Sequence, residues 1–237
     1  MCGIVGIYLK TKKFEKNLGK MLSGMLNNME SRGPDSAGFA IYKNEGKKIN
    51  KFSLCINDLN FNVFKKELSK KIKKIKLNQI SDHVILKTEE KPKKVLEILD
   101  TNFSEVSIVG YGKSIEIFKQ VGNPKDVVKK FNLEDFSGTH GIGHTRMATE
   151  SAITTDGSHP YSTGEDECLV HNGSLSNHNN LRRDLTKRGN VFNSENDTEV
   201  AAGYVSNSLS NNKSLKDTLT SGLKDLDGFY TFITGTR

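Results

Sequence analysis

The chain has 237 residues, 35% of them hydrophobic, which is enough for one large domain or two small ones. No apolar run approaches the ~20 residues of a membrane-spanning helix, and Lys10, Lys12 and Lys13 interrupt any signal-like stretch at the start. Its 3 scattered cysteines do not suggest a disulfide framework, and a thiol that must stay reduced favours a cytoplasmic protein.

The net charge of +7 is unevenly distributed. Residues 43–94 hold 15 lysines against 6 acidic residues, and the run Lys65–Lys76 contains no arginine and no aromatic residue. Those two residue types are the ones favoured for reading and stacking on bases. Because lysine outnumbers arginine 29 to 6 over the whole chain, we interpret the segment as a solvated face. A docking surface for a protein is the first alternative, and nucleic-acid binding is the last.

A buried strand is predicted for residues 3–9, and a helix follows it. Six apolar residues of this helix recur at spacings of three and four and are expected to form a core-facing stripe: Leu18, Met21, Leu22, Met25, Leu26 and Met29. Pro34 and the nearby glycines break the helix and require a tight turn over residues 31–38. Residues 38–43 return as a strand.

Residues 44–104 have the weakest pattern. Strands are predicted at 52–56 and 83–87 and a short helix at 91–100, with a further strand after the segment at 106–111. No flexible Ser/Gly linker flanks this Lys-rich segment. We therefore interpret it as an insertion into a single domain that spans residues 2–237.

From Gly138 onward the chain is rich in Gly, Thr, Ser, Asn and His. Residues 138–151 are predicted as a strand that enters a polar loop, and residues 168–173 as a strand that ends in a turn. His140 and His144 are the closest histidines, but a spacing of four has no helical meaning in a β-like stretch. We expect no metal site.

Three helices and a last strand are predicted after this. The helices start near Asn177, Asn196 and Ser214. Ser214 and Asp217 resemble a capping box. The leucines of the last helix are expected to face inward: Leu215, Leu219 and Leu223. With a final strand at 229–234, the order of elements predicts an α+β fold.

Cys2 directly follows the initiator methionine. If Met1 is removed, one residue carries both a thiol and a free α-amino group. The thiolate is a strong nucleophile, and an amine that titrates near ~8 can accept its proton. A nucleophile with its own terminal amine as base is a known catalytic arrangement. The alternative is a small residue that happens to start a buried strand.

Other polar residues fit the attack of a thiol on an amide. The side chain of Asn172 and the backbone N–H of Gly173 can donate to an oxyanion. An amino-acid substrate also needs a cation for its carboxylate, which Arg146 offers, and an anion for its ammonium group, which Asp197 offers. Each signal has a structural alternative: Asn-Gly is a common hairpin turn, Asp197 fits a helix cap, and a lone arginine is usually at the surface.

Six stretches, in order, resemble the class II glutamine amidotransferases, which are glutaminase domains of the N-terminal-nucleophile hydrolase type. They cover the chain except for 44–104, and they are 2–6 (CGIVG), 32–38 (RGPDSAG), 141–149 (GIGHTRMAT), 170–173 (VHNG), 196–199 (NDTE) and 226–228 (LDG). Residues 146–151 and 158–160 are most similar to the stand-alone glutaminase subunits of glutamate-synthase-like complexes, including those that make N-methylglutamate.

The resemblance implies a role for each matching residue. Cys2 is expected to be the nucleophile, Asn172 and Gly173 the oxyanion hole, and Arg32 an arginine beside the nucleophile. For substrate binding it implies Arg146 at the α-carboxylate of glutamine, Asp197 at its α-ammonium group and Thr149 in a loop that covers it. Met147 and Glu150 depart from the Trp and His of amino-sugar-forming relatives, which argues against an amino-sugar synthase.

The implied fold is a four-layer αββα sandwich of two antiparallel sheets. Domains of this family continue well past the strand that follows Asp227-Gly228, whereas this chain stops at Arg237. A fragment truncated at the C-terminus and a domain completed by a partner's strands are both compatible with this.

The resemblance thus implies a cytoplasmic subunit that hydrolyses glutamine and supplies ammonia to a flavin-dependent, glutamate-synthase-type partner. It implies no cofactor in this chain, and we expect no contact with nucleic acid or membrane. Two alternatives stay open: a hydrolase of another γ-glutamyl compound without a synthase partner, and a catalytically silent binding subunit.

Overall fold

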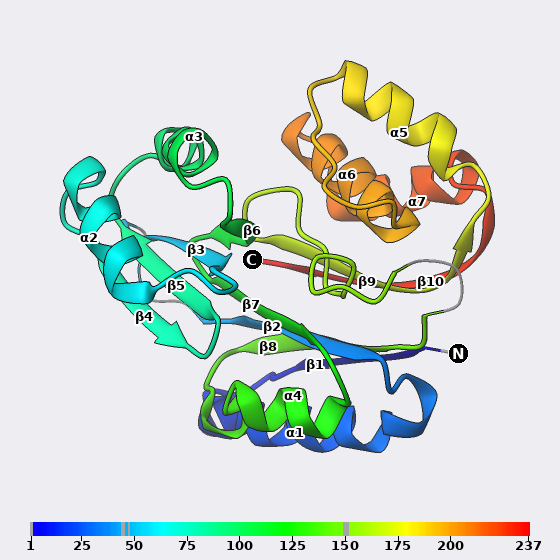
Figure 1. Ribbon diagram of the computed structural model, residues 1–237. Helices are drawn as coiled ribbons and strands as arrows, with labels where there is room; N and C mark the ends of the chain where they lie inside the picture. Colours follow the sequence, from blue (N-terminus) through cyan, green and yellow to red (C-terminus); the bar gives the residue numbers. More distant parts are fainter. Residues whose placement is uncertain (1, 44–45, 47, 149–151) are drawn as a thin grey trace.

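Two antiparallel sheets are stacked face to face in the computed structural model, which describes residues 2–43, 46, 48–148 and 152–237 (Figure 1). The first sheet contains, in spatial order, β1 (Gly3–Tyr8), β8 (His140–Arg146), β2 (Ser36–Tyr42) and β7 (Ile115–Val121). The second contains β9 (Glu167–Leu175) and β10 (Gly228–Thr236).

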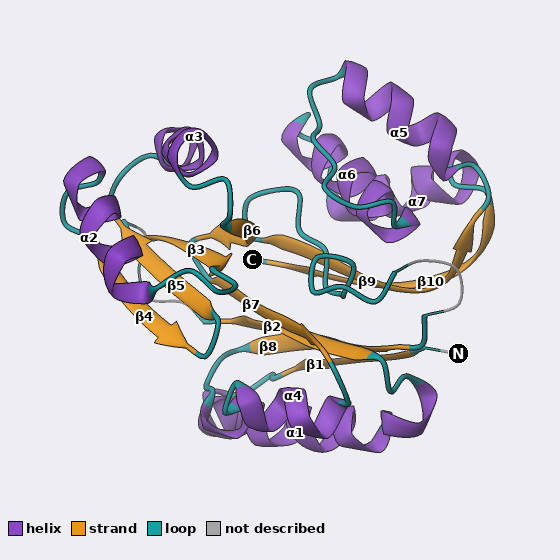
Figure 2. Ribbon diagram, viewed as in Figure 1, coloured by secondary structure: helices purple, strands orange, loops and turns teal. Residues whose placement is uncertain are grey.

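Helices cover both outer faces of this pair of sheets (Figure 2). The first sheet is covered by α1 (Leu18–Asn28) and α4 (Pro124–Lys130), and the second by α5 (His178–Lys187), α6 (Asp197–Ser210) and α7 (Leu215–Asp225). Short 3-10 helices lie at Lys12–Asn17, Glu30–Arg32 and Leu133–Asp135. Within the described ranges, no helix combines the length and apolar character needed to cross a membrane. The expected α+β, four-layer arrangement is confirmed.

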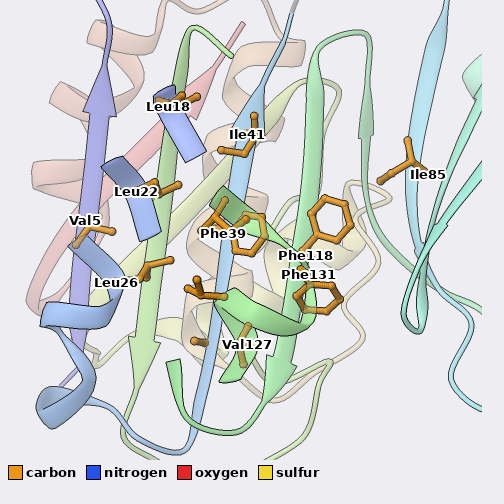
Figure 3. Close-up of a cluster of buried hydrophobic side chains, with 13 residues drawn as sticks. Val5, Leu18, Leu22, Leu26, Phe39, Ile41, Ile85, Phe118, Val127 and Phe131 are labelled. Carbon is orange, nitrogen blue, oxygen red and sulfur yellow. The ribbon is translucent and has the colours of Figure 1, made fainter. Parts of the chain in front are cut away.

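Strand β2 explains why the layers hold together, because all seven of its residues are buried. Phe39 and Ile41 pack with Leu18, Leu22 and Leu26 of α1 (Figure 3), while alternate residues of the strand face the second sheet. A strand buried on both faces is expected to be a near-continuous apolar run, as this one is from Ala37 onward. The buried stripe of α1 is narrower than predicted, because Met21 lies at its border and is 36% exposed.

The core between the two sheets is made of aliphatic side chains. Ile4, Ile117 and Ile142 come from the first sheet, and Val170 and Ile233 come from the second. Burial of each such side chain stabilises the fold by about 1.5–3 kcal/mol. This interface fixes the positions of β1, β8 and β9 relative to each other. The predicted site lies at the start of β1, at the end of β8 and along β9.

A third sheet lies beside the sandwich and contains, in spatial order, β4 (Lys76–Ile80), β5 (His83–Thr88), β3 (Asn50–Cys55) and β6 (Ser107–Gly112). With α2 (Phe61–Lys71) and α3 (Pro92–Asn102) it encloses a hydrophobic cluster of its own. We call residues 50–112 the lateral unit. The strands that flank it in sequence, β2 and β7, pair directly, which supports our proposal that this part of the chain is inserted into one domain.

Helix α7 is capped as predicted but buries a different face. Ser214 accepts a hydrogen bond from the backbone N–H of Asp217 at 3.0 Å, which confirms the capping interaction. The inward orientation predicted for Leu219 and Leu223 is wrong, because they are 39% and 77% exposed. Thr218 and Gly222 are buried instead.

Candidate active site

A cavity of about 460 Å³ opens where the start of β1, the end of β8, strand β9 and the start of α6 meet. Five of the seven predicted site residues line it: Cys2, Arg146, Asn172, Gly173 and Asp197. Arg32 lies behind Cys2, and Thr149 lies outside the described residues. A larger cavity of about 760 Å³ near the end of β10 contains no cysteine and none of the predicted site residues.

Cys2 is placed in the cavity by strand pairing. In the β1–β8 ladder Gly3 is opposite Thr145, so the residue before β1 comes next to the end of β8. The thiol Sγ lies 3.8 Å from the carbonyl oxygen of Met147, and the residue is partly exposed. The other two cysteines are buried elsewhere, so Cys2 is the accessible thiol.

Two side chains hold the main chain of Cys2. Its carbonyl oxygen accepts hydrogen bonds from Nε of Arg32 at 3.3 Å and from Nδ2 of Asn172 at 3.2 Å. Arg32 therefore lies beside the nucleophile position, as the resemblance implied. The amide of Asn172 also lies next to Cys2, and its role in an oxyanion hole stays a prediction.

Asn172 and Gly173 do not form a hairpin turn, so the predicted end of the strand at 173 is wrong. Strand β9 continues to Leu175, and Gly173 is paired with Tyr230 of β10. Gly173 has φ +138°, and a Cβ there would lie 2.0 Å from the carbonyl oxygen of Phe229. Only glycine fits this position without moving the backbone of β10.

Arg146 is 5% exposed and is the last residue of β8, so it is not the surface arginine of the alternative interpretation. Its Nη1 donates to the carbonyl oxygen of Ala152 at 3.2 Å. The turn at 32–35 supports this strand end, because the backbone N–H of Asp35 donates to the Arg146 carbonyl and a carboxylate oxygen of Asp35 accepts from the N–H of Ala148.

Asp197 is the first residue of α6, whereas the capping residue is Asn196, whose side chain accepts from the N–H of Thr198 at 2.9 Å. The carboxylate of Asp197 accepts from the N–H of Leu175 at 2.8 Å and lies 3.5 Å from Nδ1 of His171. Burial raises the pKa of Asp197, but the interactions with His171 and the Leu175 N–H outweigh burial, so the net pKa is lowered. The start of a helix further favours the anion.

The cavity therefore contains a thiol, a guanidinium group and a carboxylate from three distant parts of the chain. Such a set suits a substrate with both an α-carboxylate and an α-ammonium group. Three other buried residues of the cavity wall had no predicted role: His159, His171 and Thr198. The motifs at 158–160, 170–173 and 196–199 contained them, but only side-chain geometry shows that they touch.

Away from the cavity, one group of potential metal ligands occurs among the residues described: Cys55, Asp82 and His83. Sequence spacing did not indicate it, because Cys55 and His83 meet only through the β3–β5 pairing. Asp82 is already paired with Lys130 at 2.8 Å and with His83 at 2.9 Å. Burial opposes its ionisation, yet these partners lower its pKa to about 2.

The comparison with known proteins agrees with this arrangement. Residues 134–233 match the family described as "Glutamine amidotransferase domain". The "Glutamine amidotransferase-like protein GlxB" of Rhizobium meliloti is 48% identical over 240 residues, which covers 100% of this chain and 80% of that protein. The chain belongs to the class II glutamine amidotransferases. A protein of Methanothermobacter thermautotrophicus, also named as a glutamine amidotransferase, is 32% identical over 251 residues, covering 100% of this chain and 82% of its own.

The fold of this amidotransferase also occurs in solved structures. The "allosteric regulatory enzyme of purine biosynthesis" superimposes with a TM-score of 0.56 at 19% identity, covering 100% of this chain and 35% of that one. The expected fold is thereby confirmed, and the sequence relatives confirm the class of enzyme, while the roles of individual site residues stay predictions.

Proposed function

We propose that this amidotransferase hydrolyses the side-chain amide of glutamine, with Cys2 as its N-terminal nucleophile, and supplies the ammonia to a synthase partner. The observation that carries the proposal is the single cavity in which Cys2 lies together with Arg146, Asn172, Gly173 and Asp197. No other described cysteine has such surroundings, because Cys55 and Cys168 are buried.

The terminal amine of Cys2, exposed by removal of Met1, takes the proton of the thiol. The sulfur then attacks the side-chain carbonyl carbon of glutamine, and the C=O π electrons move to the oxygen. When this tetrahedral intermediate collapses, the C–N bond breaks, the amine returns the proton to the leaving nitrogen, and ammonia departs. Water then cleaves the γ-glutamyl thioester, which gives glutamate and restores the thiol.

Asn172 and Gly173 stabilise the oxyanion in this proposal. A side-chain amide nitrogen carries two hydrogens. One hydrogen of Asn172 is used on the Cys2 carbonyl, and the second can point to the oxyanion. Removing one oxyanion donor typically costs about 100-fold or more in rate.

Arg146 and Asp197 bind the amino-acid end of glutamine. The guanidinium of Arg146 is suited to a bidentate contact with the α-carboxylate, and the carboxylate of Asp197 to an ionic contact with the α-ammonium. We further propose that Thr149 contacts the bound substrate. These contacts place the side-chain amide at the thiol and favour substrates that carry both charges.

The partner is proposed to be a flavin-dependent subunit of the glutamate-synthase type. The support is the resemblance at 146–151 and 158–160 to glutaminase subunits of such complexes. Ammonia released into water is protonated and no longer nucleophilic, so direct transfer to a bound partner preserves its reactivity. A reactive thiol also suits the reducing cytoplasm, where we place the protein.

The test combines N-terminal mass spectrometry with a glutaminase assay of the wild type, Cys2→Ala and the control Cys55→Ala. We expect a chain that starts at Cys2 and a loss of at least about 1,000-fold in Cys2→Ala. The control should keep its activity at temperatures where it is folded. Undiminished activity in Cys2→Ala would falsify the mechanism. Release of ammonia from another γ-glutamyl compound but not from glutamine would show that glutamine is not the substrate.

A further inference from the structure

A cluster of three buried imidazoles lies at the wall of the cavity, which His159 and His171 line. His144 comes from β8, His159 from the loop before β9, and His171 from β9 itself. The rings of His144 and His159 stack with centroids 3.8 Å apart. Nε2 of His144 lies 2.9 Å from the carbonyl oxygen of His171. The cluster therefore joins three segments of the chain, and the first turn of α6 packs against it through Thr198.

The hydroxyl of Thr198 is the meeting point of this cluster. Its Oγ1 lies 2.8 Å from Nε2 of His159 and 2.9 Å from Nδ1 of His171. It also lies 3.4 Å from a carboxylate oxygen of Asp197. A hydroxyl has one hydrogen and two lone pairs, so it can donate to only one of these three groups.

The neighbours of Thr198 determine where that hydrogen points. Nδ1 of His171 carries a hydrogen, because a hydrogen on the buried, partnerless Nε2 would be orphaned; it points to Oγ1 of Thr198 at 2.9 Å, which is nearer than the Asp197 carboxylate at 3.5 Å. If Nε2 of His159 also carries a hydrogen, both rings donate to Thr198, and its own hydrogen is left for Asp197.

The opposite assignment would bury a hydrogen without an acceptor. Three ring nitrogens of the cluster are buried with no hydrogen-bond partner: Nδ1 of His144, Nδ1 of His159 and Nε2 of His171. In the first assignment all three are bare acceptors and every N–H has a partner. In the opposite one, Nδ1 of His159 is an orphaned N–H, which is the rarer and costlier defect in a protein interior.

Two rings of the cluster, those of His144 and His159, are also kept uncharged, as this assignment requires. Burial lowers the pKa of His144 to about 3 and that of His159 well below its ordinary value. The charges of Lys119 and Arg146 lower the pKa of His159 further. The hydroxyl therefore meets the neutral ring of His159, Nδ1 of His171 and the carboxylate of Asp197.

We propose that Thr198 is a positioning residue for substrate binding: two imidazoles donate into its oxygen, so its hydrogen is directed onto Asp197, whose carboxylate is thereby held in place for the α-ammonium group of the substrate. This inference rests on the proposed glutaminase function. It adds that discrimination for an α-amino group depends on a hydroxyl that does not itself need to touch the substrate.

The kinetic test compares Thr198→Val, which keeps the shape and removes the hydroxyl, with Thr198→Ser, which keeps the hydroxyl. Two substrates are used, glutamine and 4-carbamoylbutanoate, which is glutamine without its α-amino group. We expect Thr198→Val to raise KM for glutamine about tenfold, with kcat changed less than about threefold, and to change KM for the des-amino compound little. Thr198→Ser should stay within about threefold of wild type.

The proposal is overturned if Thr198→Val affects both substrates equally, or if KM for glutamine does not change. A second measurement needs no variant and no activity: nitrogen-15 NMR of the histidine rings in the wild-type protein. It should find hydrogens on Nε2 of His159 and Nδ1 of His171, and a hydrogen on Nδ1 of His159 contradicts the inference. A wild type without glutaminase activity but with this tautomer pattern would refute the proposed function and leave the hydrogen-bond arrangement standing.

Discussion

The residues around the cavity of Cys2, which we call the cavity edge, and those of the lateral unit bury different kinds of side chain. At the cavity edge the fully or nearly buried residues include Arg146, His171 and Thr198, and each is held by specific polar contacts. In the lateral unit the buried cluster is made of residues such as Phe64 and Leu99, and the lysines of α2 are exposed. Polar burial contributes little net stability but fixes geometry, whereas apolar burial stabilises without directing chemistry. The two regions should therefore respond to mutation in opposite ways.

The largest change in stability is expected in the lateral unit. Phe64 is buried and packs edge-on against Phe103 with ring centroids 5.2 Å apart. Phe64→Ala should lower the free energy of unfolding by about 4 kcal/mol in denaturant titrations, because it leaves a cavity. Glutaminase activity of the folded variant should remain within about threefold of wild type. A specific loss of activity without a loss of stability would show that this unit takes part in catalysis.

The next effect lies at the cavity edge and involves the backbone. Gly173→Ala forces a Cβ against β10 at a positive φ, so we expect a loss of about 3 kcal/mol in stability together with most of the activity. Gly189 is the matched control, because it also has a positive φ (+91°) but nothing within 4 Å of the added Cβ. Gly189→Ala should cost only about 1 kcal/mol and leave activity intact. Equal effects of both changes would show that close packing against β10 is not the reason for glycine at position 173.

A smaller effect is expected when the positive charge of Arg146 is kept and the shape of its side chain is changed. Arg146→Lys retains the positive charge but loses the planar fork, so KM for glutamine should rise about 30-fold, which corresponds to about 2 kcal/mol. The control is Arg183→Lys on an exposed face of α5, where KM should not change. An unchanged KM in Arg146→Lys would place the α-carboxylate elsewhere.

The buried imidazoles predict a dependence of stability on pH, which is small over a single pH unit. Ordinary histidine titrates near 6.5, whereas burial lowers the pKa of His144 to about 3. Below pH 6.5 the unfolded chain binds a proton that the folded chain excludes. Stability from this group is therefore fully present above pH 6.5 and declines by about 1 kcal/mol per unit as pH falls towards 3.

The variant His144→Gln isolates this contribution, because glutamine can still donate to the His171 carbonyl but does not titrate. Stability is measured by denaturation from pH 7 to pH 4. As pH falls, the wild type should lose more stability than the variant. The comparison also cancels other buried groups, such as Glu167, whose pKa burial raises to about 8. A constant difference over this range would mean that His144 is not held neutral.

The same contrast explains how much of the fold the sequence could predict. Strands β1 and β2 and the cap of α7 have strong local signals, namely apolar runs and the Ser214–Asp217 pair. Helix α2 was missed because its lysines suggested only a charged surface. Its N-cap, Asn60, which accepts from the N–H groups of Asn62 and Val63, was a usable sign. The pairing of Gly173 with Tyr230 could not be predicted, because Asn-Gly favours a turn unless a distant strand imposes another conformation.

The site residues could be named from the sequence because their motifs resemble a known family. Their meeting in one cavity depends on long-range pairing, since the β1–β8 register carries Cys2 to Arg146. The contacts of Thr198 with two histidines had no sequence signal. Such contacts depend on side-chain distances between segments that are tens of residues apart.

The most direct measurement of the central claim is labelling with a glutamine analogue that carries an electrophilic carbon in place of the side-chain amide, followed by peptide mapping. The account predicts one adduct, on a chain that begins at Cys2, with labelling that excess glutamine prevents and that Asp197→Asn weakens. Labelling of Cys55 or Cys168, labelling that glutamine does not prevent, or an N-terminus that retains Met1 would contradict it.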